Sequence, residues 1–269
     1  KLIFNLLIFF GLNKKNLVIR NSVKWKLDIS EGIDLSIFLF GAFQQDLVKS
    51  INEYICKDKH SNNTFFNIID IGSNIGDKSL SIAQSLSNKN FNRYKIFSIE
   101  PTDYAFKKQI NNIKLNPNLK KKIKSFKYFV SNEKKKPNNI YSSWRLDSNE
   151  KTHEVHKGVL KKVNKLTDII SLDNFIKKNK IKNKIILKID VDGFEMNVLK
   201  SSIKTLKKMK PIIFMEYAPY LFYENSFSSK EFFKFLKRYN YKIYDLNFNK
   251  LNKINIKKGA SIDIILNPL

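Results

Sequence analysis

From residue 65 onward, short apolar runs alternate with segments of helical periodicity, and this alternation restricts the chain to an α/β fold. The runs are apolar at nearly every position, as in the buried strands of a parallel sheet. Strands are predicted at 66–71, 94–99, 125–130, 185–189 and 211–215, and helices at 77–86, 104–115, 172–178, 195–206 and 229–239. The fold class is therefore predicted to be a Rossmann-like, doubly wound, mostly parallel sheet.

Two further predicted strands, 241–246 and 261–266, close the chain without a helix between them. They predict a hairpin, and with it a closing antiparallel strand at the end of the sheet. This arrangement fits a methyltransferase sheet of class I type better than a dehydrogenase sheet.

The first 62 residues are predicted to be a small extension in front of the main domain, which spans 63–269. Residues 17–20 and 23–27 predict a β-hairpin, and residues 37–55 have the apolar spacing of a helix. The first ten residues are apolar but only about half as long as a membrane span, so no transmembrane segment is expected. We expect an amphipathic helix or strand that packs on the domain, with the end of a signal or anchor segment as the alternative. A charged, irregular stretch at 132–163 is predicted to be an insertion or mobile loop that helps to shape the substrate site.

The chain carries a formal net charge of +26, which at first suggests a nucleic-acid partner. However, 46 of its 50 basic residues are lysine, whereas specific phosphate and base recognition relies on the planar guanidinium of arginine. We therefore expect a solvated lysine surface with weak, unspecific attraction for acidic glycans, nucleic acid or anionic lipid. No specific nucleic-acid partner is predicted.

Cysteine occurs once, as Cys56, which excludes a disulfide within the chain and a zinc site built on several cysteines. No metal site is predicted. Without a disulfide framework the expected compartment is the cytoplasm. Nothing near Cys56 would activate its thiol, so we expect a small core residue.

The turn after the first predicted strand has the sequence Asp70-Ile-Gly72-Ser73-Asn74-Ile-Gly76. Ligands of open α/β sheets bind at the carboxyl ends of the strands, and glycines allow the backbone to approach them closely. The G-x-x-x-G spacing matches neither the dinucleotide fingerprint nor the P-loop. An acidic residue before the first glycine suits a cationic ligand such as the sulfonium end of S-adenosylmethionine. An ordinary strand-to-helix turn is the alternative.

The second predicted strand ends in Glu100-Pro101, 24 residues after Gly76. A carboxylate at this point can accept hydrogen bonds from both ribose hydroxyls of a nucleoside. A helix-start or surface charge is the alternative for Glu100, but the preceding glycine loop at this spacing favours the nucleoside role.

The segment 187–195 brings one lysine and three carboxylates to the carboxyl end of a central strand: Lys188, Asp190, Asp192 and Glu195. Strand alternation points Lys188 and Asp190 to the same side. Such a cluster can share protons, orient a hydroxyl or bind a divalent ion. Helix capping is the alternative, and for Asp192 it explains the residue as well as a functional role does. Glu216 lies at the same edge, at the end of the next strand.

In order and spacing, these blocks resemble the FkbM family of S-adenosylmethionine-dependent methyltransferases. That family typically has D-x-G-x-N-x-G, E-P, N-I-x-L-N, K-I-D-V-E-G-x-E and a strand that ends in glutamate. Here the motifs correspond to residues 70–76, 100–101, 112–116, 188–195 and 211–216, so the resemblance covers about 65–217. Asp192 stands in place of the usual glutamate, and Phe194 in place of a small residue.

The resemblance implies S-adenosylmethionine as the cofactor and methyl transfer to a hydroxyl group of a sugar, a glycan or a small natural product. The residues implied to hold the cofactor are Asp70, Gly72, Ser73, Asn74, Gly76, Glu100 and Pro101. Asp190 or Glu195 is the expected base, with Glu216 third. Lys188 and Asp192 are expected to contact the acceptor.

Three alternatives stay open at this point. His153 and His156 in the insertion are a minor alternative for the base, because lone histidines in a lysine-rich loop are more often surface residues. The charge suggests a nucleic-acid methyltransferase, but residues 217–220 match the [DN]-P-P-[YF] motif only in part, and a Pro-Cys nucleophile is absent. The third is a non-catalytic nucleoside-binding module of a polysaccharide pathway.

Overall fold

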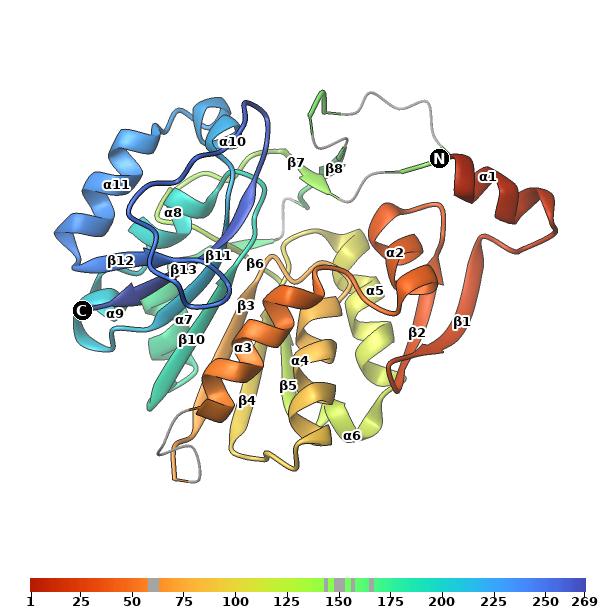
Figure 1. Ribbon diagram of the computed structural model, residues 1–269, viewed down its shortest axis with the longest axis horizontal. Helices are drawn as coiled ribbons and strands as arrows, with labels where there is room; N and C mark the ends of the chain where they lie inside the picture. Colours follow the sequence, from red (N-terminus) through yellow and green to blue (C-terminus); the bar gives the residue numbers. More distant parts are fainter. Residues whose placement is uncertain (58–62, 143–144, 148–152, 156–157, 165–166) are drawn as a thin grey trace.

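The computed structural model describes residues 1–57, 63–142, 145–147, 153–155, 158–164 and 167–269. A seven-stranded sheet with the order β12-β13-β11-β10-β3-β4-β5 lies at its centre (Figure 1). The strands are β3 (Phe66–Ile71), β4 (Tyr94–Ile99), β5 (Ile123–Phe126), β10 (Lys184–Ile189), β11 (Ile212–Tyr217), β12 (Tyr241–Tyr244) and β13 (Ile262–Pro268). Neighbouring strands are parallel except for β13, which runs antiparallel to both β11 and β12. The predicted doubly wound sheet with a closing antiparallel strand is confirmed.

The strand order changes direction at β3, which pairs with β10 on one side and with β4 on the other. The register places Ile71 opposite both Ile189 and Ile99, so these three strands end at the same level. In an open parallel sheet, a crevice forms where the strand order reverses, outside the carboxyl ends of the strands. The loops that carry the predicted site residues therefore meet at this edge.

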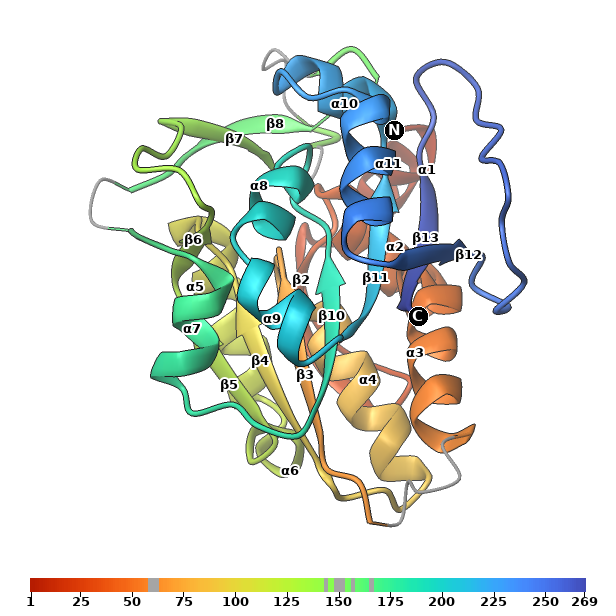
Figure 2. The same cartoon turned by 90° about the vertical axis from the view of Figure 1, so that its left-hand side faces the viewer.

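One layer of helices covers each face of the sheet (Figures 1 and 2). The first layer contains α3 (Gln45–Lys57), α4 (Asp77–Asn88), α5 (Asp103–Lys114) and α6 (Pro117–Lys120), and the second contains α7 (Leu172–Lys178), α8 (Glu195–Lys200), α9 (Ile203–Lys208) and α11 (Ser229–Arg238). Successive side chains of β3 point to opposite faces of the sheet, so Ile68 packs in one core cluster and Ile69 in the other. All six residues of β3 are buried, as its unbroken apolar pattern predicts.

Three predicted elements are divided in two. The helix predicted at 37–55 is α2 (Gly32–Phe40) followed by α3, because Gly41 ends α2 in the left-handed conformation, with φ of 85°. The helix predicted at 195–206 is α8 and α9, since the hydroxyls of Ser201 and Ser202 donate to the carbonyls of Val198 and Leu199. The strand predicted at 125–130 is β5 and β6 (Tyr128–Val130), and β6 leaves the main sheet to pair with β9 (Asp168–Ile170).

The insertion contains more regular structure than predicted. Two short strands, β7 (Asn139–Ser142) and β8 (Val159–Lys162), pair antiparallel above the carboxyl edge of the sheet (Figure 2). A further short helix, α10 (Pro219–Glu224), follows β11 and begins with a proline, which suits the first helical turn.

The predicted β-hairpin of the N-terminal extension is confirmed as β1 (Lys15–Arg20) and β2 (Val23–Asp28). The buried face of β2 carries Trp25, which packs in the same core cluster as Phe66 of β3. The outer edge of β2 is paired by two asparagine side chains, one in α5 and one in the turn between α5 and α6. Asn116, in the turn, accepts from the Lys24 N–H at 2.9 Å and donates to the Lys24 carbonyl at 2.8 Å. Asn112 accepts from the Lys26 N–H at 2.9 Å. The two asparagines of the N-I-x-L-N motif therefore attach the extension to the main domain.

Two expectations for the extension were wrong. The first residues form the helix α1 (Leu2–Phe9), but it is not amphipathic, because apolar side chains occupy every face and only Phe4 is buried. Cys56 is exposed, not in the core, because the buried stripe of α3 ends at Ile55 and the next residue points away. Within the described ranges, no helix is both long enough and apolar enough to cross a membrane.

Candidate active site

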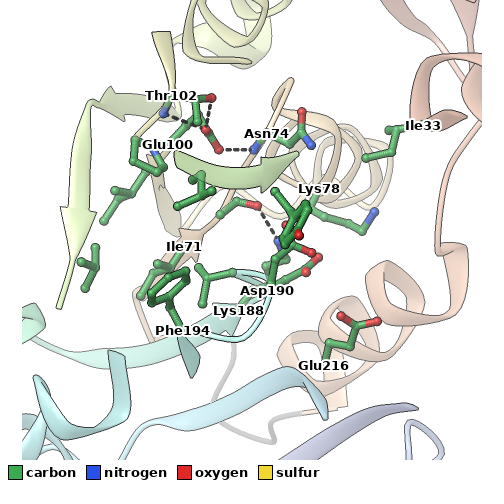
Figure 3. A pocket seen from close by; sticks show the side chains of 18 of the residues that line it. Ile33, Ile71, Asn74, Lys78, Glu100, Thr102, Lys188, Asp190, Phe194 and Glu216 are labelled. Carbon is green, nitrogen blue, oxygen red and sulfur yellow. Dashed lines mark hydrogen bonds and ion pairs between the residues drawn. The ribbon is translucent and has the colours of Figure 1, made fainter. Parts of the chain in front are cut away.

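A pocket opens at the carboxyl ends of β3, β4, β10 and β11 (Figure 3). The predicted site residues that line it are Gly72, Asn74, Glu100, Pro101, Lys188, Asp190, Asp192 and Glu216. The predicted site residues that do not line it are Asp70, Ser73, Gly76 and Glu195. The two predicted motifs at the ends of β3 and β4 and the carboxylates at the ends of β10 and β11 thus face one cavity.

Gly72 is held against the neighbouring strand end. Its φ is +77°, and a Cβ at this position would lie 1.8 Å from the carbonyl oxygen of Asp190. The amides of Gly72 and Ser73 both donate to the Ile99 carbonyl at 3.0 Å. Only glycine permits this close approach, so the glycine loop packs directly on the loop that follows β10. Gly76, with φ of +85°, forms the sharp entry into α4.

Glu100 joins the first two loops of the pocket. Its Oε2 accepts from the Asn74 amide at 3.0 Å, and its Oε1 accepts from the amide and the hydroxyl of Thr102 at 3.0 and 2.6 Å (Figure 3). Burial raises the pKa of Glu100, while these three hydrogen bonds lower it. The carboxylate is therefore fixed in one orientation on the pocket wall.

Asp70 lies beneath the pocket and positions Lys188. Its Oδ2 accepts from the Ser79 hydroxyl at 2.7 Å, and its Oδ1 lies 3.2 Å from Lys188 Nζ. The same ammonium donates to the Gly72 carbonyl at 3.0 Å and lies 3.4 Å from Asp190 Oδ2. Although burial lowers the pKa of Lys188, the charges of Asp70 and Asp190 raise it above its ordinary value, so the ammonium stays charged.

In the loop between β10 and α8, the predicted carboxylates Glu195 and Asp192 have different environments: Asp192 lines the pocket and Glu195 does not. Glu195 Oε1 accepts from the amides of Val191 and Gly193 at 3.1 and 3.2 Å, so Glu195 caps the loop. Burial raises the pKa of Glu195 to about 7. Asp192 has a positive φ of 48° and lines the pocket, and burial together with the charge of Asp190 raises its pKa.

Glu216 stands at the other side of the pocket. Figure 3 shows Glu216 and Glu100 at opposite sides of the cavity, with Asp190 between them. The Ser261 hydroxyl donates to Glu216 Oε1 at 2.6 Å, while burial and the charge of Asp190 raise the pKa of Glu216 to about 8. Burial likewise raises the pKa of Asp263, which pairs with Glu216 from the neighbouring strand β13, to about 6. Among the described residues, no group of three or more His, Cys, Asp or Glu side chains is arranged to hold a metal ion.

The pocket also contains a buried lysine that the sequence motifs did not predict. Lys78, in the first turn of α4, is 1% exposed and forms an ion pair with Asp77. Its Nζ donates to the Phe43 carbonyl at 2.9 Å and lies 4.7 Å from the centre of the Phe43 ring. Because Phe43 belongs to the N-terminal extension, this region supplies part of the pocket wall. Its place directly after Gly76-Asp77 was the only signal that sets Lys78 apart from the other lysines.

The insertion contributes Ile140 and Tyr141 to the pocket wall. His153 anchors this part of the insertion: its Nε2 lies 2.9 Å from both carboxylate oxygens of Glu224, and its ring stands edge-on to Tyr141 at 4.8 Å. The expectation of a surface histidine was wrong for His153, because this side chain is buried and contacts Glu224 of α10. His153 does not line the pocket, and His156 lies outside the described residues.

Comparison with known proteins gives a family match and several fold-level likenesses. The family model "Methyltransferase FkbM domain" matches residues 70–243. No curated protein matches the chain. The solved methyltransferase FkbM from Methylobacillus flagellatus KT is 16% identical with a TM-score of 0.43, and the match covers 79% of this chain and 47% of that chain. This chain therefore spans about half the length of that protein.

Two other solved methyltransferases are similarly distant. The plantazolicin methyltransferase BpumL, solved in complex with SAH, is 12% identical with a TM-score of 0.45, and the match covers 84% of each chain. The magnesium protoporphyrin IX methyltransferase ChlM from Synechocystis PCC 6803, solved with bound SAM, is 8% identical with a TM-score of 0.43, and the match covers 84% of this chain and 79% of that chain. At these identities the likeness does not extend beyond the fold.

Proposed function

The chain belongs to the FkbM methyltransferase family, and from that premise we propose that it transfers a methyl group from S-adenosylmethionine to a hydroxyl group of a sugar, a glycan or a small natural product. The observation that carries this proposal is one pocket with a fixed carboxylate, Glu100, on one side, Glu216 on the opposite side and Asp190 between them. Glu100 suits a nucleoside. Asp190 and Glu216 suit a reacting centre in which a cationic sulfonium gives up its methyl group and the acceptor hydroxyl loses its proton.

The pocket residues fit S-adenosylmethionine by their chemistry. Glu100 accepts three hydrogen bonds from the protein, and a carboxylate has about four acceptor directions, so one remains for a ribose hydroxyl. Pro101, Phe129 and Val130 supply apolar surface for an adenine ring. The carboxylates of Asp190 and Asp192 favour a sulfonium cation.

S-adenosylmethionine supplies an electrophilic methyl group, so the protein has to orient the acceptor hydroxyl and take up its proton. Glu216 is the proposed proton acceptor, because a pKa raised to about 8 makes its carboxylate a stronger base than an ordinary glutamate. Asp190, which is held by the Lys188 ammonium, is proposed to orient the hydroxyl. Glu195 is better explained as the cap of the β10–α8 loop than as the base.

Aromatic side chains favour an acceptor with a ring. Tyr141, Phe194 and Tyr220 line the pocket together with Glu216, and flat aromatic surfaces pack well on the apolar faces of sugar rings. This arrangement supports a sugar or a cyclic natural product as the acceptor.

Calorimetric titration of S-adenosylmethionine and S-adenosylhomocysteine into the wild type and Glu100→Gln tests the proposal. We expect the wild type to bind both ligands and Glu100→Gln to lose about 1–3 kcal/mol of binding free energy, because a ribose hydroxyl loses a charged acceptor. Glu133→Gln, an exposed glutamate outside the pocket, is the matched control and should bind like the wild type. A folded wild type that binds neither ligand contradicts the proposal.

Acceptor screening with S-adenosylmethionine that carries a radiolabelled methyl group tests the proposed methyl transfer to a hydroxyl. Transfer to hydroxylated sugars or metabolites supports O-methylation. Tight cofactor binding without transfer to any hydroxyl acceptor would instead indicate a nucleoside-binding module without methyltransferase activity.

A further inference from the structure

The helix α1 presents an apolar stripe to solvent. Leu2, Leu6 and Phe9 lie one helical turn apart on one side, and Ile3 and Phe10 flank them. Leu2 is 75% exposed, Phe9 82% and Phe10 80%. Isolated exposed apolar residues are ordinary, but a continuous stripe of large side chains marks an interaction surface.

The stripe remains after α1 has packed on the protein. On the opposite side of the helix, Phe4 is buried against Ile29 and Leu35, with Leu7 and Ile8 packed beside them. The core contact of α1 is therefore complete, and a second apolar surface is left without a described intramolecular partner.

The outer face of the neighbouring β1–β2 hairpin carries apolar and cationic side chains next to each other. Leu17 and Ile19 on β1 are 68% and 61% exposed. Their cross-strand partners on β2 are Lys26 and Lys24, and opposite residues of an antiparallel pair point to the same face. Figure 1 shows α1 and this hairpin together at one end of the molecule, away from α11 and β12.

A basic groove lies beside the hairpin, between β2 and α5. Lys14, Lys15, Lys26, Lys107 and Arg145 are among the residues that line it. Lys14 and Arg145 form ion pairs with Asp147. Across the described part of the chain, Lys15, Lys26 and Lys107 form no ion pair, so their charges are available to an anionic partner.

We propose that α1 and the outer face of the β1–β2 hairpin dock on the surface of an anionic phospholipid bilayer. Phe and Leu side chains insert at the boundary of head groups and acyl chains, while adjacent lysines bind lipid phosphates. Because Phe4 on one side of α1 is packed against Ile29 and Leu35, the opposite, exposed side of the helix would lie along the interface. The +26 net charge of the chain adds a long-range attraction to the same surface.

A second copy of the chain fits this surface less well. A twofold interface places the same patch on both sides, so the unpaired lysines of one hairpin would face those of the other. Like charges opposed across an interface weaken association. A bilayer of anionic lipid provides the complementary charge instead.

Vesicle flotation tests the proposal with the whole chain. The probes are phosphatidylcholine vesicles and vesicles that contain about one-third phosphatidylglycerol. We expect binding to the anionic vesicles at low salt, at least about ten-fold weaker binding to neutral vesicles, and partial release at high salt. A wild type that stays unbound with anionic vesicles at low salt overturns the proposal.

Two sets of variants separate the apolar from the cationic contribution. Leu6→Ser with Phe9→Ser and Phe10→Ser should lower the vesicle partition coefficient at least about ten-fold, whereas Phe233→Ser, a 41% exposed phenylalanine on α11, should not. Lys24→Glu with Lys26→Glu should weaken binding more than the equal charge change Lys234→Glu with Lys237→Glu on α11. Circular dichroism confirms that each variant is folded. The proposal is overturned if the variants of α1 or the hairpin and their controls on α11 have equal effects. It is also overturned if the wild type is a dimer that binds no vesicles and that the α1 variant dissociates.

Discussion

Lys188, which lines the pocket, lies beside Asp70, which is beneath it, with Nζ 3.2 Å from Oδ1 and both side chains buried. They come from the adjacent parallel strands β10 and β3, where the register places them directly opposite each other. Because the same ammonium also donates to the Gly72 carbonyl, this pair fixes the distance between the glycine loop and the carboxylate loop. Asp70 is thus best explained as a support for the pocket and not as a contact of the cofactor.

The first prediction concerns this buried pair. Lys188→Met leaves the Asp70 carboxylate without its cation, and an unpaired buried charge costs about 3–5 kcal/mol. We expect a loss of this size in the free energy of unfolding by urea. The double variant Asp70→Asn with Lys188→Met should lose clearly less than the sum of the two single variants, because the two residues interact directly. Additive losses would show that the pair is not coupled.

The second prediction concerns the contact between the loops. Gly72→Ala places a Cβ 1.8 Å from the Asp190 carbonyl oxygen, in a backbone conformation with positive φ. We expect a loss of more than about 3 kcal/mol in the free energy of unfolding, since the backbone of one loop must shift. Gly11→Ala is the matched control: its φ is +84° but no atom lies within 4 Å, so about 1 kcal/mol should be lost. Similar losses for both variants would refute a specific contact at Gly72.

Local sequence signals predict the regular elements well. The strand at 94–99 and the helix at 172–178 have the predicted bounds, the second because the Ser171 hydroxyl accepts from the Asn174 amide as an N-terminal cap. The division of the helix at 37–55 depends on Gly41, a residue that can end a helix or be tolerated within one. Only the packing of α2 against the hairpin decides between these outcomes.

The site is harder to predict than the fold, because side-chain direction depends on residues distant in sequence. The motifs locate the strand ends, yet Asp70 turns toward Ser79 and Lys188, and Glu195 turns back onto its own loop. In the sequence Lys78 resembles the other lysines, and its role depends on a hydrogen bond to the carbonyl of Phe43, which is distant in sequence. His153 is buried among partners that are distant in sequence, Glu224 on α10 and Tyr141 on β7.

The third prediction concerns the asparagine that attaches the N-terminal extension. Asn116→Ala removes both hydrogen bonds to the Lys24 backbone and leaves the N–H and carbonyl of Lys24 without these partners. We expect a loss of about 1–3 kcal/mol in the free energy of unfolding and faster proteolysis within residues 15–28. Asn118→Ala, an exposed position two residues later, should change neither quantity. Equal protection of the hairpin in both variants would contradict this role of Asn116.

The fourth prediction follows from the raised pKa of Glu216. Its carboxyl group holds a proton up to about pH 8 in the folded protein, whereas the unfolded chain releases it near the ordinary value of 4.5. The folded state therefore binds more protons between these values, and the free energy of unfolding should fall as the pH rises from about 5 to 8. Glu216→Gln should reduce this slope, and the rest should remain because Glu195 and Asp192 also have raised pKa values. Chemical unfolding at several pH values measures the slope of the free energy of unfolding against pH, with Glu133→Gln as the control.

The same titration has an opposite effect on catalysis. If Glu216 takes the proton of the acceptor hydroxyl, only its ionised form is active, so kcat/KM should rise with pH toward a plateau above about 8. Glu216→Gln should lower kcat/KM by about 100-fold or more and remove this rise, while the affinity for S-adenosylhomocysteine stays within a few-fold of the wild type. Asp190→Asn should lower the rate and keep the rise with pH, because the proton acceptor is intact, but the rise should move to lower pH, because the charge of Asp190 no longer raises the pKa of Glu216. If Asp190→Asn abolishes the rise and Glu216→Gln preserves it, Asp190 is the base and the two roles are exchanged.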